Sequence, residues 1–192
     1  MSPVFETYLK SYAGFSDSEI SQITSLAITQ HLRRKEFLLR EGSVCRYKSF
    51  IVSGLLRVFG TDSDGSEHIL QFCPEHTWTL DAESYDRQIP SACNIAAVED
   101  TEILLWRKSD FDKLLVEIPL LKTVAEKLIS SAVYNSRQRL LTVLSASPEH
   151  KYNDFITKFP DLFGRLPLRM IAAYLGISLK TLTRIRHAQL HR

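Results

Sequence analysis

The chain has 192 residues, of which 44% are hydrophobic and 24% charged, proportions typical of a globular protein and not of a disordered or fibrous one. No apolar run reaches the ~18 residues that span a bilayer, and the first 15 residues lack the pattern of a secretory signal, so we expect a cytoplasmic protein without membrane contact. The three cysteines (Cys45, Cys73 and Cys93) form no Cys-x-x-Cys pair, which argues against an iron–sulfur or structural zinc site and favours reduced thiols.

Basic side chains gather at the C-terminal end. The formal net charge is only +2, yet residues 164–192 contain six Lys or Arg and no Asp or Glu. The rest of the chain holds 18 basic and 22 acidic residues and is therefore net negative. Because such local asymmetry is the electrostatic footprint of phosphate binding, we look for a nucleic-acid partner in this last segment.

The first predicted elements are two helices. Apolar residues recur at helical spacing from Val4 to Tyr12, and Gly14 ends the pattern. Residues 16–19 have the Ser-x-x-Glu form of a capping box, in which a hydroxyl and a carboxylate satisfy exposed backbone amides. A second short helix should therefore begin there.

From residue 27 to 106 the chain predicts strands. Short apolar and β-branched runs alternate with turn residues, and the turn at 62–65 joins two runs as a hairpin. Many short strands at a spacing of about 8–12 residues indicate a sandwich or a jelly-roll barrel. The predicted strands are 27–32, 37–39, 47–53, 54–61, 67–73, 77–79, 92–97 and 101–106.

Helical pattern returns at Ser109, which we expect to be the N-cap of a helix, and Pro119 suits the first turn of another. From residue 120 to 144 apolar residues form a stripe over about 25 residues. This stripe is longer than a small barrel needs, so it most simply packs against a second copy of the chain. The residues predicted at this dimer interface are Leu121, Val124, Leu128 and Ala132.

Beyond a short helix at 149–159 and a loop marked by Pro160 and Gly164, residues 166–186 have the pattern of a helix-turn-helix. Gly176 suits the turn, and Ser178 should cap the second helix. Lys180 and Arg184 would reach base edges in the major groove. The residues predicted to contact DNA are Arg169, Ser178, Leu179, Lys180, Thr181, Thr183, Arg184 and Arg186.

The whole chain resembles the cyclic-AMP receptor / fumarate–nitrate regulator (Crp/Fnr) superfamily. Residues 37–42 and 47–58 resemble its first glycine turn and its strand–glycine–strand signature, and residues 167–185 resemble its DNA-reading end. The resemblance implies an α+β fold with three parts. They are a cyclic-nucleotide-binding-like β jelly-roll with flanking helices (1–118), a dimerisation helix (119–146) and a helix-turn-helix domain lacking an obvious wing (147–192).

The resemblance implies a homodimeric, sequence-specific transcription regulator, not an enzyme, that binds double-stranded DNA at a palindromic site, with RNA polymerase as a further partner. The sensor departs from the family pattern. Nucleotide-binding members use a Gly-Glu pair and, about ten residues later, an Arg-Ser or Arg-Thr pair to hold the phosphate. Here Leu80-Asp81 and Ser91-Ala92 stand in those places, so the arginine that would neutralise the phosphate is missing. We therefore expect no tight binding of cyclic AMP and name no effector.

The residues that would line an effector pocket are Asp81, Arg87 and Ser91, although the bulky side chains of Trp78, Leu80 and Tyr85 could fill it. No metal or cofactor is expected, because Glu67 and His68 would point to opposite faces of a strand and no His-x-His pair occurs. A metal-dependent barrel enzyme is therefore disfavoured.

One alternative stays open. Lys180 stands where the family often has Glu, and no wing follows the second helix. The chain could then be a dimeric sensor or scaffold that acts through a protein partner, with a degenerate DNA-binding end. Specific DNA binding would weaken steeply with salt, and this separates the two hypotheses.

Overall fold

The computed structural model describes residues 2–12 and 14–190. The chain divides into two compact units, one built from residues 1–60 and 70–128 and the other from 61–69 and 129–192. The long helix α5 (Pro119–Ser145) contributes to both units, and the tip of one β-hairpin groups with the second.

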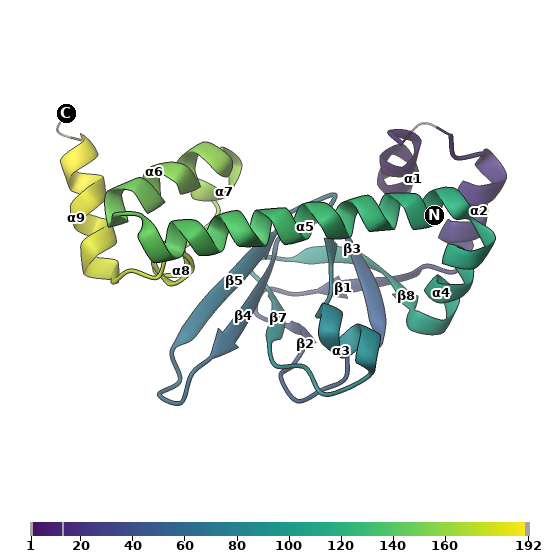
Figure 1. The fold of residues 1–192 in the computed structure, drawn as a ribbon, viewed down its shortest axis with the longest axis horizontal. Coiled ribbons are helices and arrows are strands. Elements are labelled where there is room, and N and C mark those ends of the chain that lie inside the picture. Colours follow the sequence, from purple (N-terminus) through teal and green to yellow (C-terminus); the bar gives the residue numbers. More distant parts are fainter. Residues whose placement is uncertain (1, 13, 191–192) are drawn as a thin grey trace. The chain divides into compact units, whose positions relative to one another are not determined.

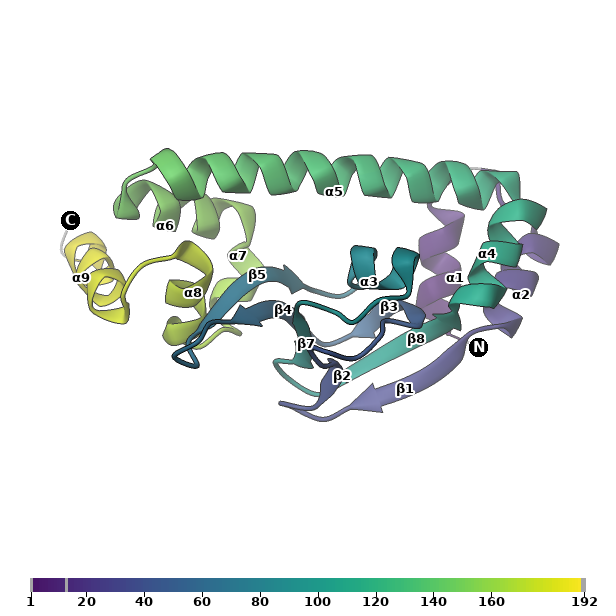
Figure 2. The same ribbon diagram turned by 60° about the horizontal axis from the view of Figure 1, so that its bottom comes forward.

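The first unit contains two antiparallel four-stranded sheets (Figures 1 and 2). One has the strand order β1-β8-β3-β6, with Leu105 of β8 opposite both Ile28 of β1 and Ser49 of β3. The other has the order β2-β7-β4-β5, with Val58 of β4 opposite Ile95 of β7. The strands are β1 (Ile28–Leu32), β2 (Phe37–Leu39), β3 (Tyr47–Ser53), β4 (Leu56–Thr61), β5 (Glu67–Cys73), β6 (Trp78–Thr79), β7 (Asn94–Ala97) and β8 (Thr101–Arg107).

Alternation along the strands builds two hydrophobic clusters on opposite faces of one sheet. On β8, Ile103 and Leu105 belong to an interior cluster shared by both sheets, whereas Leu104 and Trp106 belong to an outer one. The outer cluster is covered by α1 (Pro3–Lys10), α2 (Asp17–Ser25), α4 (Lys108–Glu117) and the start of α5. There the Trp106 indole donates a hydrogen bond to the Ile23 carbonyl at 2.8 Å.

Gly54 lies at the point where β3 turns into β4, with φ at +92°. A Cβ atom at this position would come within 2.6 Å of the Asp100 carbonyl and closer still to the Thr101 hydroxyl. Only glycine allows both this backbone conformation and this close approach. The glycine of the signature at residues 47–58 is thus required by the packing of the sheet.

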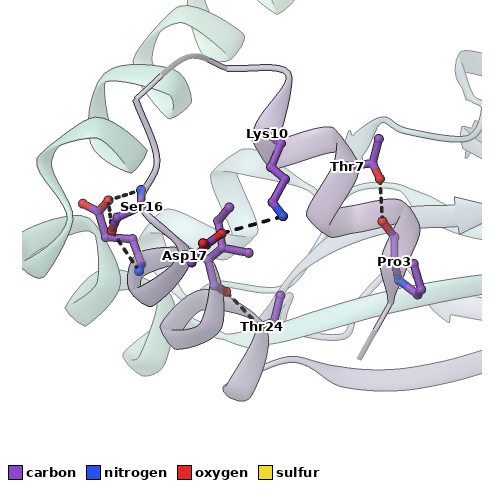
Figure 3. A network of polar contacts seen from close by, with 8 residues as sticks. Pro3, Thr7, Lys10, Ser16, Asp17 and Thr24 are labelled. Atoms are coloured by element: carbon purple, nitrogen blue, oxygen red, sulfur yellow. Dashed lines mark hydrogen bonds and ion pairs between the residues drawn. The ribbon is translucent and has the colours of Figure 1, made fainter.

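Local signals near the N-terminus acted as predicted. The capping box of α2 is present, since the Ser16 amide donates to Glu19 Oε2 at 2.8 Å and the Glu19 amide donates to Ser16 Oγ at 3.3 Å (Figure 3).

The predicted N-cap at Ser109 is wrong. Helix α4 begins at Lys108, directly after β8, and the Lys108 amide donates to the Arg46 carbonyl at 3.0 Å. A backbone bond from the neighbouring chain segment therefore replaces the expected side-chain cap.

The described part of the second unit consists of the hairpin tip at 61–69, the rest of α5, and α6 (Pro148–Lys158), α7 (Pro160–Phe163), α8 (Leu168–Leu175) and α9 (Leu179–Leu190) (Figure 1). Helix α7 occupies the stretch where a loop was predicted, because Pro160 suits the first turn of a helix. Tyr152 and Phe155 of α6 are buried, and the Phe155 ring lies 5.5 Å from that of Tyr174.

The structure confirms the predicted α+β class, with a β-rich sensor followed by helices. The observed strands differ from the predicted ones by at most two residues at either end. Helix α3 (Ala82–Arg87) had not been predicted. None of the described helices is both long and apolar enough to span a membrane.

Candidate nucleic-acid interface and sensor site

Helices α8 and α9 form the helix-turn-helix. Gly176 between them has φ at +65°, and a Cβ atom there would meet nothing within 4 Å, so the backbone conformation and not the space calls for glycine. The Ile177 amide donates to the Ala172 carbonyl at 3.1 Å, which closes α8. Ser178 Oγ accepts a hydrogen bond from the Thr181 amide at 3.0 Å and caps α9. The predicted turn and cap are therefore both confirmed.

One side of this motif is buried. Ile171, Ala172 and Leu175 of α8 and Leu182 and Ile185 of α9 are each at most 4% exposed, as predicted. The opposite face of α9 is exposed and presents a shallow hollow. The hollow is lined by Leu179, Lys180, Thr181, Thr183, Arg184 and His187.

The predicted DNA contacts fall into two groups. Four of the side chains already make contacts within the protein. Ser178 and Thr181 share a hydroxyl contact of 2.9 Å, Thr183 Oγ1 donates to the Leu179 carbonyl at 2.9 Å, and the Arg186 guanidinium lies 5.3 Å from the Phe163 ring.

The remaining four are Arg169 on α8 and Leu179, Lys180 and Arg184 on α9, and all are exposed. The cations on the outward face of α9 are four residues apart, so they lie above one another on one side of the helix. Lys180 and Arg184 therefore form a pair of exposed cations on one side of α9.

Arg139 of α5 is a structural residue that the sequence analysis missed. Its Nη2 donates to the Ile69 carbonyl of the hairpin tip and to the Tyr174 carbonyl of α8, both at 2.8 Å. Its guanidinium also lies 4.1 Å from the centre of the Tyr174 ring. Burial raises the pKa of the Tyr174 hydroxyl, and the charge of Arg139 opposes this rise. Nothing in the sequence distinguishes Arg139 from the exposed Arg137.

In the first unit, Asp81 and Ser91, two of the predicted pocket residues, contact one another. Ser91 Oγ donates to Asp81 Oδ2 at 2.6 Å, and the Ser84 amide donates to Asp81 Oδ1 at 3.3 Å, so Asp81 also caps α3. Burial alone would raise the pKa of Asp81, but the hydrogen bonds from Ser91 and Ser84 outweigh it and hold that pKa below its ordinary value. The carboxylate is therefore ionised at neutral pH.

Arg87 does not join this pair. It is exposed, and its Nη1 lies 2.6 Å from Glu83 Oε1, one helical turn away on α3. The Asp81–Ser91 pair thus has a negative charge without Arg87 beside it, which is unfavourable for a bound phosphate.

Bulky side chains occupy the barrel interior in part as predicted. Tyr85 is only 9% exposed and belongs to the interior cluster, against which Leu80 packs. The Tyr85 hydroxyl is buried and finds no hydrogen-bond partner among the residues that the structure describes. Trp78 points outward instead, because its indole donates to the Tyr8 hydroxyl at 3.0 Å in the outer cluster.

The three thiols are buried or half-buried within the protein. Cys45, Cys73 and Cys93 are free, and burial raises the pKa of each thiol, to about 11 for Cys73. His68 and His76 are exposed. Within residues 2–12 and 14–190, no three His, Cys, Asp or Glu side chains gather to hold a metal ion.

The structure corrects the predicted dimer interface on α5 at its first two residues. Leu121 and Val124 are 2% and 5% exposed, and Leu121 belongs to the outer cluster of the sensor, so the chain itself already covers both. Leu128 is half-buried and Ala132 is exposed. Beyond them the apolar side chains lie open to solvent at 44–76% exposure. They are Ile129, Val133, Tyr134, Leu140, Leu141 and Leu144.

These features define a protein with a β-rich domain and a helix-turn-helix. Residues 29–117 match the cyclic nucleotide-binding domain family. The chain is 28% identical over 144 residues to the transcriptional regulatory protein Btr of Bordetella pertussis, an alignment that covers 69% of this chain. It spans only 58% of the length of that relative.

Solved structures share the fold. The chain is similar to FixK2 from Bradyrhizobium japonicum, with a TM-score of 0.74 at 18% identity over 86% of this chain and 84% of that one. It is also similar to the c-di-GMP-responsive global regulator CLP of Xanthomonas campestris, with a TM-score of 0.77 at 9% identity over 92% of each chain. These likenesses show that the chain shares its fold with FixK2 and CLP.

Proposed function

We propose that this chain is a homodimeric, sequence-specific DNA-binding transcription regulator whose sensor barrel does not bind cyclic AMP tightly. The exposed face of α9 is the observation that carries the proposal. Lys180 and Arg184 stand on that face, the helix is capped by Ser178 and packed through Leu182 and Ile185, and residues 164–192 contain no acidic side chain. Two exposed cations on a capped and packed helix, in an acid-free segment, suit a DNA groove.

Dimerisation is inferred from α5. Six large apolar side chains between residues 129 and 144 are exposed, and a contiguous patch of this kind usually marks an interaction surface. A second copy of the same helix offers a matching apolar stripe. Two paired chains would present two recognition helices about 34 Å apart, one turn of the duplex, and so read a palindrome.

The sensor proposal rests on the ionised Asp81. A cyclic nucleotide would bring its phosphate charge near this carboxylate, and Arg87 is engaged with Glu83 instead. Titration calorimetry with cyclic AMP should therefore show no saturable heat at micromolar ligand. Micromolar affinity would contradict this part of the proposal. An effector of other chemistry and RNA polymerase as a partner remain predictions from the family resemblance.

The decisive experiment begins with capture of genomic DNA fragments by the purified protein, followed by a salt titration on the enriched sequence. A short palindrome should be recovered, and its affinity should fall steeply with salt as counterions are released. The double variant Lys180→Ala/Arg184→Ala should lose the enrichment. The control Arg34→Ala removes an exposed cation from the sensor and should retain it.

The single variant Arg184→Ala should lose roughly 1–3 kcal/mol of specific binding free energy if Arg184 contacts a base. If the wild-type protein enriches no sequence at any salt concentration, DNA recognition fails as an explanation. A scaffold acting through a protein partner would then be the better one.

A further inference from the structure

The outward face of α9 has an unusual hydrogen-bonding character. Lys180 offers three N–H donors and no acceptor, and Arg184 offers five donors and no acceptor. Between Leu179 and His187 the sequence has no Asp, Glu, Asn or Gln. Base-reading side chains on this helix therefore donate hydrogen bonds and hardly accept them.

The nearby hydroxyls keep acceptor lone pairs, but their short side chains are held close to the helix. Thr183 Oγ1 donates its proton to the Leu179 carbonyl at 2.9 Å, which holds the short side chain against its own helix. Ser178 and Thr181 are engaged with each other at the cap. His187 lies two turns beyond the cap, outside the N-terminal turns that contact bases in helix-turn-helix proteins.

Leu179 adds an apolar element to the same end of the helix. It is 47% exposed. In the major groove the apolar group that a side chain can meet is the methyl group of thymine. Acceptors there are N7 and O6 of guanine, N7 of adenine and O4 of thymine, whereas cytosine presents only an amino donor.

We propose that each half-site is read through acceptor atoms of guanine by Arg184 and Lys180 and through a thymine methyl by Leu179, and that no cytosine amino group is contacted. This inference rests on the proposed function. The two cations are four residues apart, a rise of roughly 6 Å along the helix, so they reach different base pairs. A carboxylate at position 180 would accept a hydrogen bond from a donor such as the cytosine amino group, whereas the Lys180 ammonium can only donate one.

The first test uses the enriched duplex and 7-deazaguanine, which keeps Watson–Crick pairing but lacks N7. Replacement of one guanine at a time should weaken wild-type binding about tenfold at two positions in each half-site, since a good bidentate contact is worth roughly that discrimination or more. Deoxyuridine in place of one thymine should weaken it about fourfold, the value of one buried methyl group.

The second test repeats the sequence selection with variants of Lys180. Lys180→Glu should convert one preferred G·C pair in each half-site to C·G and leave the Arg184 position unchanged. Lys180→Met keeps an unbranched stem without the charge and should lose preference at that pair alone.

Two results would overturn the inference while leaving DNA binding intact. One is specific binding that tolerates 7-deazaguanine at every position. The other is a Lys180→Glu variant that selects the wild-type sequence, which would place Lys180 on a phosphate. Absence of any enriched sequence for the wild-type protein would overturn the proposed function together with the inference.

Discussion

Arg139 gives the most direct test of how the second unit is held together. Its guanidinium donates two hydrogen bonds of 2.8 Å to the Ile69 and Tyr174 carbonyls. Hydrogen bonds to a charged group contribute about 1.5–3 kcal/mol each, and the lower value applies because Arg139 is only half-buried. Arg139→Ala should therefore lower the local stability of this unit by about 3 kcal/mol.

The assay is amide hydrogen exchange followed by mass spectrometry on peptides that cover the hairpin tip at 61–69 and helix α8. Exchange in both should rise about 150-fold in Arg139→Ala, because about 1.4 kcal/mol corresponds to a factor of ten. Arg139→Lys can retain one of the two bonds and should lie between the variant and the wild type.

Arg137→Ala is the matched control. Arg137 is exposed on the same helix, and its removal should change stability by less than about 0.5 kcal/mol. Equal exchange in Arg139→Ala and Arg137→Ala would refute the argument that Arg139 joins the hairpin tip to α8.

Three further predictions follow from single residues. Leu140→Asp should convert the proposed dimer to a monomer in analytical ultracentrifugation. Leu121→Asp should instead unfold the first unit, because of the two leucines only Leu121 is buried within the chain. Gly176→Ala should lower the free energy of unfolding by about 1–2 kcal/mol in thermal unfolding, because residue 176 has a positive φ. Gly164→Ala, at φ −76°, should leave the free energy of unfolding unchanged. The ionised Asp81 stabilises the fold above about pH 4 because its folded-state pKa is lowered, and this stability is lost as the pH falls. Asp81→Asn should therefore be less stable than the wild type at neutral pH, by a difference that shrinks as the pH falls. A pH-independent difference would contradict this.

The helix-turn-helix could be predicted almost completely because its signals are local. Gly176 permits the left-handed turn and Ser178 caps α9, and each acts within four residues of its own position. The apolar spacing that places Ile171 and Leu182 inside depends only on the period of a helix. The capping box at Ser16 was predictable for the same reason.

Two predictions failed for different reasons, one at long range and one within a single short helix. Ser109 has the chemistry of an N-cap, but β8 runs into α4 and the Arg46 carbonyl supplies the partner. Arg87 follows Asp81 by six residues, yet helix α3 turns it toward Glu83 and away from the Asp81–Ser91 pair. Only the Ser109 outcome depends on a distant residue, because the Glu83–Arg87 ion pair spans a single turn of one helix.

The sequence by itself determined the order of barrel, long helix and helix-turn-helix, and the concentration of positive charge at the C-terminal end. These follow from periodicity, backbone preference and composition, which are properties of neighbouring residues. Tertiary structure alone decided which part of the α5 stripe is covered, since Leu121 meets the sensor core and Leu140 does not. It also decided that Arg139, and not Arg137, is built into the second unit, because an amphipathic pattern defines a face but not the surface against which that face packs.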